Sequence, residues 1–209
     1  MLVTHPQSTA VMHPRLFGGV GYYAVMASCG HAVVDTFARY DKRAKDTHRY
    51  TIADTRGVLR LTVPVGKPDI PGATWRDIPI SDHGHWWNIH RTTLESAYGR
   101  TPFFEFYIDR FLPLFQPQGS LGMPATVGEL IEASDAILRA IAGIETDVSY
   151  GPVQGAAYEV LPSGDQCPEY YQVRSSRLGF IPDLSMLDLI FNMGPETPLV
   201  LRRWIQHMK

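Results

Sequence analysis

Cysteine is nearly absent from this chain of 209 residues, which has only Cys29 and Cys167. Two cysteines cannot form the network of disulfides that holds many small secreted domains together. The first residues also lack the basic start and the apolar core of a secretory signal peptide. We therefore expect a cytoplasmic protein in a reducing compartment.

Long apolar runs and an excess of one charge are also missing. No stretch of about 18 consecutive apolar residues occurs, so we expect no membrane insertion. The chain has 19 Lys and Arg against 21 Asp and Glu, which gives a formal net charge of −2. This balance provides no general attraction to nucleic acid, so we expect no nucleic-acid partner. Local basic patches can still bind small anions.

Three signatures of common enzyme classes do not occur in the sequence. No GxGxxG opens a helix, GxxxxGK[ST] is missing, and no GxSxG marks a serine nucleophile. The sequence therefore gives no support to a dinucleotide-binding, P-loop or α/β-hydrolase site, and it identifies no cofactor. We expect Cys29 to be buried and inert, and Cys167 to be the more exposed of the two.

Hydrophobic periodicity and turn residues predict the order of the secondary-structure elements. We expect a helix over 18–28, a buried strand over 31–36, and a hairpin turning at Gly57 between strands 50–54 and 58–65. Further helices are expected over 84–98, 101–115, 126–143, 184–194 and 198–208, with a short strand over 146–150. Strands followed mostly by helices predict an α+β fold, in which several helices pack on a small mixed sheet within a single domain.

Capping residues sharpen three of these helix boundaries. Thr126 and Glu129 have the spacing of a capping box, in which each side chain binds a free backbone N–H group of the first turn. Thr101, followed by Pro102, is expected to cap the helix over 101–115. Gly99 is expected to end the helix before it with a positive φ.

The stretch HGHWWNIHRTTLESAYG, residues 83–99, holds three of the eight histidines. On a helix His90 lies over the tryptophans and is expected to be half-buried, as a base or as a structural histidine. Arg91 is expected to offer a bidentate fork to an anion or to be a solvated surface charge. A metal site formed by His83, His85 and His90 is a less favoured alternative, because positions 85 and 90 do not share a helix face.

Two other segments concentrate polar groups that suit an anion. Tyr40, Lys42, His48 and Arg49 fall within ten residues of a loop between predicted strands. Near the C-terminus, Asp183 or Ser185 is positioned to cap the 184–194 helix, whose N-terminus is a possible anion site. A solvated face and ordinary helix caps are the structural alternatives for these two segments.

Three segments of the sequence, taken together, point to a family. They are LTVPV (61–65), HRTTLESAYGRTPFFEFY (90–107) and GFIPDLSMLDLIFNMGP (179–195). Their order and spacing resemble the WbqC-like protein family, small bacterial proteins found among genes for O-antigen and other surface polysaccharides. The resemblance implies one WbqC-like domain over 1–209, with a core at about 13–195 and a C-terminal helix over 196–209.

The resemblance also implies a set of functional residues. We expect His90 as the catalytic base and Glu95 as a residue that orients either His90 or Arg91. Substrate-binding roles are expected for Tyr40, Lys42, Arg49, Arg91, Tyr98, Asp183, Ser185, Asp188 and Asn192. Independently of the resemblance, Trp87 is expected to bind substrate by stacking on a sugar or a base. Two departures from the family pattern affect this set: segment 40–49 is one residue longer than expected, and Asp183 stands where asparagine is more usual.

Genomic association implies a function in the assembly of surface polysaccharide. The favoured hypothesis is an enzyme that modifies a nucleotide-linked or amino sugar by acyl or aminoacyl transfer. The alternatives are a non-catalytic binding or assembly protein of such a pathway and, less favoured, a metal-dependent hydrolase.

Overall fold

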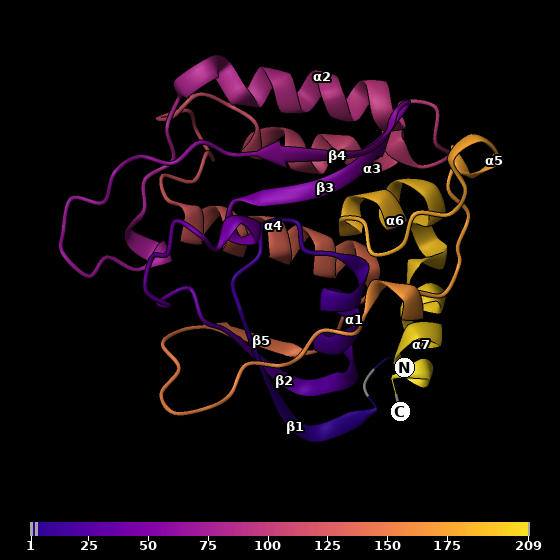
Figure 1. Ribbon diagram of the computed structural model, residues 1–209, viewed down its shortest axis with the longest axis horizontal. Helices are drawn as coiled ribbons and strands as arrows, with labels where there is room; N and C mark the ends of the chain where they lie inside the picture. Colours follow the sequence, from indigo (N-terminus) through magenta and orange to yellow (C-terminus); the bar gives the residue numbers. More distant parts are fainter. Residues whose placement is uncertain (1, 3, 209) are drawn as a thin grey trace.

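Two separate groups of strands give the fold its frame. The computed structural model describes residue 2 and residues 4–208 of the chain. Strands β1 (His5–Met12), β2 (Cys29–Val34) and β5 (Asp147–Tyr150) form a parallel sheet in the order β1-β2-β5. Strands β3 (Arg49–Asp54) and β4 (Gly57–Thr62) form an antiparallel hairpin of their own. Figure 1 shows the hairpin on one side of the central helices and the parallel sheet on the other.

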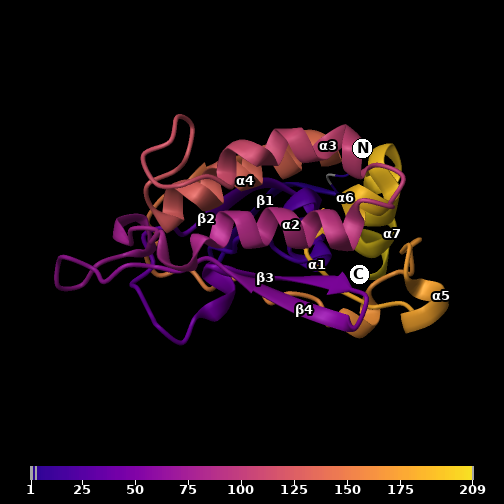
Figure 2. The same ribbon diagram turned by 90° about the horizontal axis from the view of Figure 1, so that it is seen from above.

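The helices fill the space between these strands and cover them. They are α1 (Val20–Ser28), α2 (Trp86–Tyr98), α3 (Phe104–Phe111), α4 (Val127–Ala142), α5 (Ser175–Leu178), α6 (Met186–Met193) and α7 (Thr197–His207). Figures 1 and 2 both show α2 running alongside the hairpin, which it contacts through β3. Helix α6 is central, and its residues from Met186 to Asn192 are all buried. The α+β fold expected from the sequence, with a small mixed set of strands, is thus confirmed.

Helix α1 connects the parallel strands β1 and β2 in a β-α-β unit. Every residue of this helix is buried, which explains why VGYYAVMAS is apolar on all sides. Helix α7 packs against it, and a Cβ at Gly21 would lie 3.0 Å from the buried Trp204 ring. Glycine at position 21 therefore allows the two helices to pack closely.

Several local predictions agree with the structure. Thr126 and Glu129 form the expected capping box at the start of α4. Gly143 ends α4 with a φ of 62°, and Gly57 lies at the hairpin turn with a φ of 119°. The residues after position 150 are mostly irregular up to α5, as expected.

Two local predictions were wrong, and one strand was not predicted. Gly99 has a φ of −56°, so the chain stays in right-handed geometry at the residue that follows α2. Thr101 does not cap α3, which begins at Phe104; its hydroxyl donates instead to the carbonyl oxygen of Tyr98. Strand β1 was missed because HPQSTAVM alternates poorly and includes a proline, and its pairing with β2 is interrupted between His5 and Thr9. Within the described residues, every helix is too short or too polar to span a bilayer.

Candidate functional site

A polar cleft of about 400 Å³ opens where three distant segments of the chain meet. The segments are the loop after β1, the approach to β3 with the facing part of β4, and the turn before α6. We call this space the first cleft. Its lining residues are Arg15, Leu16, Phe17, Gly18, Gly19, Lys45, Asp46, Arg49, Tyr50, Thr51, Arg60, Asp183 and Ser185.

Backbone hydrogen bonds fix the three segments relative to one another. Gly19 and Ser185 form an antiparallel bridge, and the N–H of Met186 donates to the carbonyl of Gly18 at 2.8 Å. The N–H of Ser185 donates to the carbonyl of Thr51, also at 2.8 Å. The walls of the first cleft are therefore joined by main-chain bonds, which hold the lining side chains in defined places.

Positive charge dominates the first cleft although the whole chain is slightly acidic. Four cations line it, Arg15, Lys45, Arg49 and Arg60, against the two carboxylates Asp46 and Asp183. Arg15 pairs with Asp46 at 3.2 Å across partly exposed surface. The Nε of Arg49 donates to the Thr62 hydroxyl at 2.8 Å, which orients its guanidinium group. This charge balance suits a small anion, above all a phosphate or carboxylate.

The N-terminus of α1 borders the first cleft, but an internal carboxylate occupies it. Asp183 accepts a hydrogen bond from the N–H of Gly21 at 2.9 Å. A Cβ at Gly19 would lie 2.6 Å from the same carboxylate oxygen, so position 19 needs glycine. Burial raises the pKa of Asp183, and the Gly21 N–H opposes this effect. Cationic side chains, rather than the free end of this helix, are thus the groups able to hold an anion.

Unusual backbone geometry is concentrated at this cleft. Three residues other than glycine have a positive φ among the described residues, and two of them, Phe17 and Asp183, line the first cleft. Such conformations cost about 1–3 kcal/mol each and tend to occur at functional sites. The bonds around Gly18 and Ser185 supply the constraint that maintains both of them.

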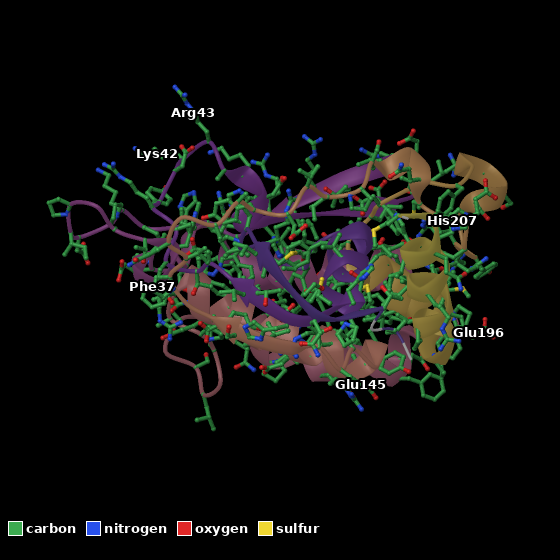
Figure 3. All side chains as sticks on the ribbon, turned by 90° about the horizontal axis from the view of Figure 1, so that it is seen from below. Phe37, Lys42, Arg43, Glu145, Glu196 and His207 are labelled. Atoms are coloured by element: carbon green, nitrogen blue, oxygen red, sulfur yellow. The ribbon has the colours of Figure 1, made fainter. Side chains whose placement is uncertain are left out.

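Of the residues singled out in the sequence, Arg49, Asp183 and Ser185 lie together in the first cleft. Ser185 also caps α6, as expected, through a hydrogen bond from the Leu187 N–H at 3.3 Å. Asp183 caps α1 rather than α6. Tyr40 packs edge-on against Trp75 outside the first cleft. Figure 3 shows Lys42 at the tip of its loop, extended away from the body of the protein.

Tyr98, Asp188 and Asn192 form a second, buried group. Asp188 accepts hydrogen bonds from the Tyr170 hydroxyl at 2.7 Å and from the Gln172 amide at 3.1 Å. Asn192 accepts a bond from the Val173 N–H at 2.9 Å. The cavity beside these residues measures about 10 Å³, space for about one water molecule. The group therefore holds the chain over 170–181 against α6, and its cavity has no room for a substrate.

Trp87 and His90 lie in the core, although a half-buried His90 was expected. His90 is 2% exposed and is enclosed by Trp86 and Phe115. Its Nδ1 lies 3.1 Å from the hydroxyl of Tyr50, a residue that lines the first cleft. Burial lowers the pKa of His90 to about 4. His90 thus lies behind the cleft wall as a neutral imidazole.

Other candidates from the same stretch face solvent. Arg91 and Glu95 are exposed on α2, and neither lines the first cleft. His83 and His85 are exposed as well, and the described residues contain no group of three His, Cys, Asp or Glu side chains able to hold a metal ion. The structure therefore separates most of this stretch from the first cleft.

Cys167 was expected to be the more exposed of the two cysteines but is buried, and burial raises its pKa to about 11.

A further constellation lies on the exposed face of the parallel sheet. The Nδ1 of His31 is 3.1 Å from a carboxylate oxygen of Asp147, and its Nε2 is 3.3 Å from the hydroxyl of Ser149. This order resembles a Ser-His-Asp triad. The Asp147 side chain is 85% exposed, so water competes for it, and none of the three residues lines the first cleft. We interpret the group as a clamp that holds the edge strand β5 on β2.

Sequence reasoning did not single out Arg15, Lys45, Arg60 or the Gly18–Gly19 backbone. Arg15 lies in the loop after β1, and the run Gly19-Val-Gly21 opens α1. Glycines that enter a helix after a strand are a known signal of close backbone approach. The sequence before these glycines alternates poorly, so it does not identify the strand that would make this signal specific.

Comparison with known proteins gives one match. A family model described as the WbqC-like protein family matches residues 13–161. No curated protein and no solved structure matches the chain. The matched residues include the four cations of the first cleft and exclude Asp183 and Ser185.

Proposed function

The chain belongs to the WbqC-like protein family, and on this premise we propose that the first cleft binds the phosphate of a nucleotide-linked sugar or of a phosphorylated amino sugar. We further propose that the protein is an enzyme of surface-polysaccharide assembly that transfers an acyl or aminoacyl group to this sugar. The first part rests on the cleft, and the second rests on the family association and on one carboxylate.

The main support for phosphate binding is the set of four cations around the first cleft. They come from three different parts of the chain, and Arg49 is held in place by Thr62. Arginine side chains bind phosphate through paired hydrogen bonds, and the charge-assisted bonds are stronger than neutral ones. A cleft of about 400 Å³ lies within the usual range for small-molecule sites.

Asp183 is the side chain in the cleft that suits proton transfer. In the proposed step, the amine of the sugar attacks the carbonyl carbon of an activated acyl donor. A C–N bond forms, the leaving group departs with its electron pair, and Asp183 accepts the proton from nitrogen. Burial raises the pKa of Asp183, which makes it a stronger base than an exposed carboxylate. His90 is separated from the cleft by Tyr50, so we assign the role of base to Asp183 instead.

A thermal-shift screen followed by calorimetry tests the binding proposal. The probes are UDP-, GDP-, dTDP- and CMP-linked sugars and the same sugars without phosphate. A ligand present at about 100 times its dissociation constant adds about 2.7 kcal/mol of stability, which raises the melting temperature measurably. We expect shifts only with phosphate-bearing probes.

Variants locate the binding. Arg60→Ala removes an exposed cation of the cleft, so we expect about tenfold weaker binding of the selected probe. Arg91→Ala removes an exposed arginine outside the cleft and is the matched control. Equal affinities for Arg60→Ala and the unaltered protein would overturn the assignment. Asp183→Asn keeps an acceptor for the Gly21 N–H, so it should bind the probe but fail to transfer the acyl group.

A further inference from the structure

A second polar cleft, of about 370 Å³, adjoins the first. Both clefts are lined by Arg15, Lys45 and Asp46. The second cleft lies beyond the carboxyl end of β1, where ligands commonly bind at parallel sheets. Its lining residues are His13, Pro14, Arg15, Ala38, Arg39, Asp41, Arg43, Ala44, Lys45, Asp46, Thr47 and Trp75.

The two clefts have different walls. The second cleft includes Pro14, Ala38 and Trp75, which provide apolar surface of the kind that accepts a flat ring. The first cleft also contains Thr51, which is the cross-strand neighbour of Arg60, together with Asp183 and Ser185. These polar groups suit the hydroxyls or amine of a sugar. Positive charge is concentrated where the clefts meet, at Arg15 and Lys45.

We propose that one ligand occupies both clefts: a sugar joined to a nucleoside through a diphosphate. The diphosphate lies at Arg15 and Lys45, the nucleoside enters the second cleft, and the sugar enters the first. This inference rests on the proposed function and extends it, since it specifies an intact nucleotide-linked sugar and not a free amino sugar.

Asp46 has a defined part in this arrangement. Its carboxylate lies 3.2 Å from the Arg15 guanidinium, where the two clefts meet. Asp46 is therefore paired with a cation that the diphosphate needs. The ligand must replace this carboxylate when it binds. The Asp46 side chain is 70% exposed, and exposed ion pairs are weak, so the exchange has a small cost.

The direction of the Arg43 side chain leaves Arg39 as the arginine with which the second cleft can be tested. Figure 3 shows the Arg43 side chain extended away from the protein, although the residue lines the cleft. Arg39 is the other arginine that belongs to the second cleft and not to the first. Arg39 and Arg60 therefore form a matched pair of exposed arginines, one for each cleft.

Calorimetry with three probes tests the inference: UDP-N-acetylglucosamine, UDP, and N-acetylglucosamine 1-phosphate. We expect the intact nucleotide sugar to bind at least about tenfold more tightly than either fragment, because it uses both clefts. Arg39→Ala should weaken UDP and the intact ligand, and it should leave the sugar phosphate unchanged. Arg60→Ala should weaken the sugar phosphate and the intact ligand, and it should leave UDP unchanged. Asp46→Asn should tighten the intact ligand by up to about fivefold.

The outcomes separate the two proposals. If none of the three probes binds to the unaltered protein, the proposed function itself is overturned. If the sugar phosphate binds and responds to Arg60→Ala, but the intact ligand does not respond to Arg39→Ala, the proposed function stands and the two-cleft ligand is refuted. Arg91→Ala should change none of the three affinities.

Discussion

Asp188 offers a direct test of how burial and hydrogen bonding compete in this protein. It is 2% exposed, and Tyr170, Gln172 and Tyr98 direct donors toward it. Burial disfavours the charged form, while the three donors favour it. Burial prevails, and it raises the pKa of Asp188 to about 6. The perturbation we consider is Asp188→Asn, which keeps the shape and removes the titration.

The magnitude follows from the two pKa values of Asp188. The difference between 3.8 in the unfolded chain and about 6 in the folded chain corresponds to about 3 kcal/mol. Between these values the folded protein retains a proton that the unfolded chain releases. The contribution of Asp188 to stability is therefore present at low pH and is lost as pH rises from about 4 to about 6.

The assay is urea unfolding of both proteins at intervals from pH 4 to pH 7. The asparagine variant does not lose stability through deprotonation at position 188. Its free energy of unfolding, relative to that of the unaltered protein, should therefore rise by about 3 kcal/mol across the interval. Taking the difference removes the effect of all other titrating groups that the two proteins share. A difference that stays flat, or falls with rising pH, would refute the reasoning, since the three donors would then outweigh burial.

His90 provides a comparison of opposite sign. Burial lowers its pKa from 6.5 to about 4, so its contribution to stability is present above pH 6.5 and is lost as pH falls toward 4. A His90→Phe variant should gain stability relative to the unaltered protein on acidification, again by about 3 kcal/mol. The two groups oppose one another in the same pH range, so the unaltered protein should show a nearly flat profile between pH 4 and 6 from this pair.

Two further predictions concern the fold. Thr126→Ala removes the capping box of α4 and should lower the free energy of unfolding by about 1 kcal/mol in urea titration, whereas Thr92→Ala on the exposed face of α2 should change it little. Gly194→Ala should cost about 2–5 kcal/mol, because φ is +48° and the new Cβ would lie 2.4 Å from the Phe103 ring. Gly155→Ala, with φ of +71° and open space around it, should cost only about 1–2 kcal/mol by the same measurement. Equal costs at the two glycines would show that contact with Phe103 contributes nothing.

Part of the candidate site was predictable from neighbouring residues. Arg49 was singled out because basic groups cluster before β3, and Ser185 because it precedes an apolar helical pattern. Each signal extends over a few positions, and each residue does lie at the first cleft. By contrast, His90 has polar and aromatic neighbours in sequence that suit a site, but its helix face turns toward the core. Hydrophobic periodicity identifies the helix face on which a residue lies, but it does not identify the element against which that face packs.

The hairpin and the helices with strong capping signals could be predicted from the sequence, because caps and turns depend on φ, ψ and hydrogen bonds among residues a few positions apart. The Thr126 cap and the turn at Gly57 belong to this class. Only the tertiary structure decided the site. Asp183 caps α1 through the N–H of Gly21, which lies 162 positions earlier in the sequence. Arg15 forms its ion pair with Asp46, which lies 31 positions later. Such pairs depend on how whole elements pack, and local sequence patterns contain no information on the distance between remote segments.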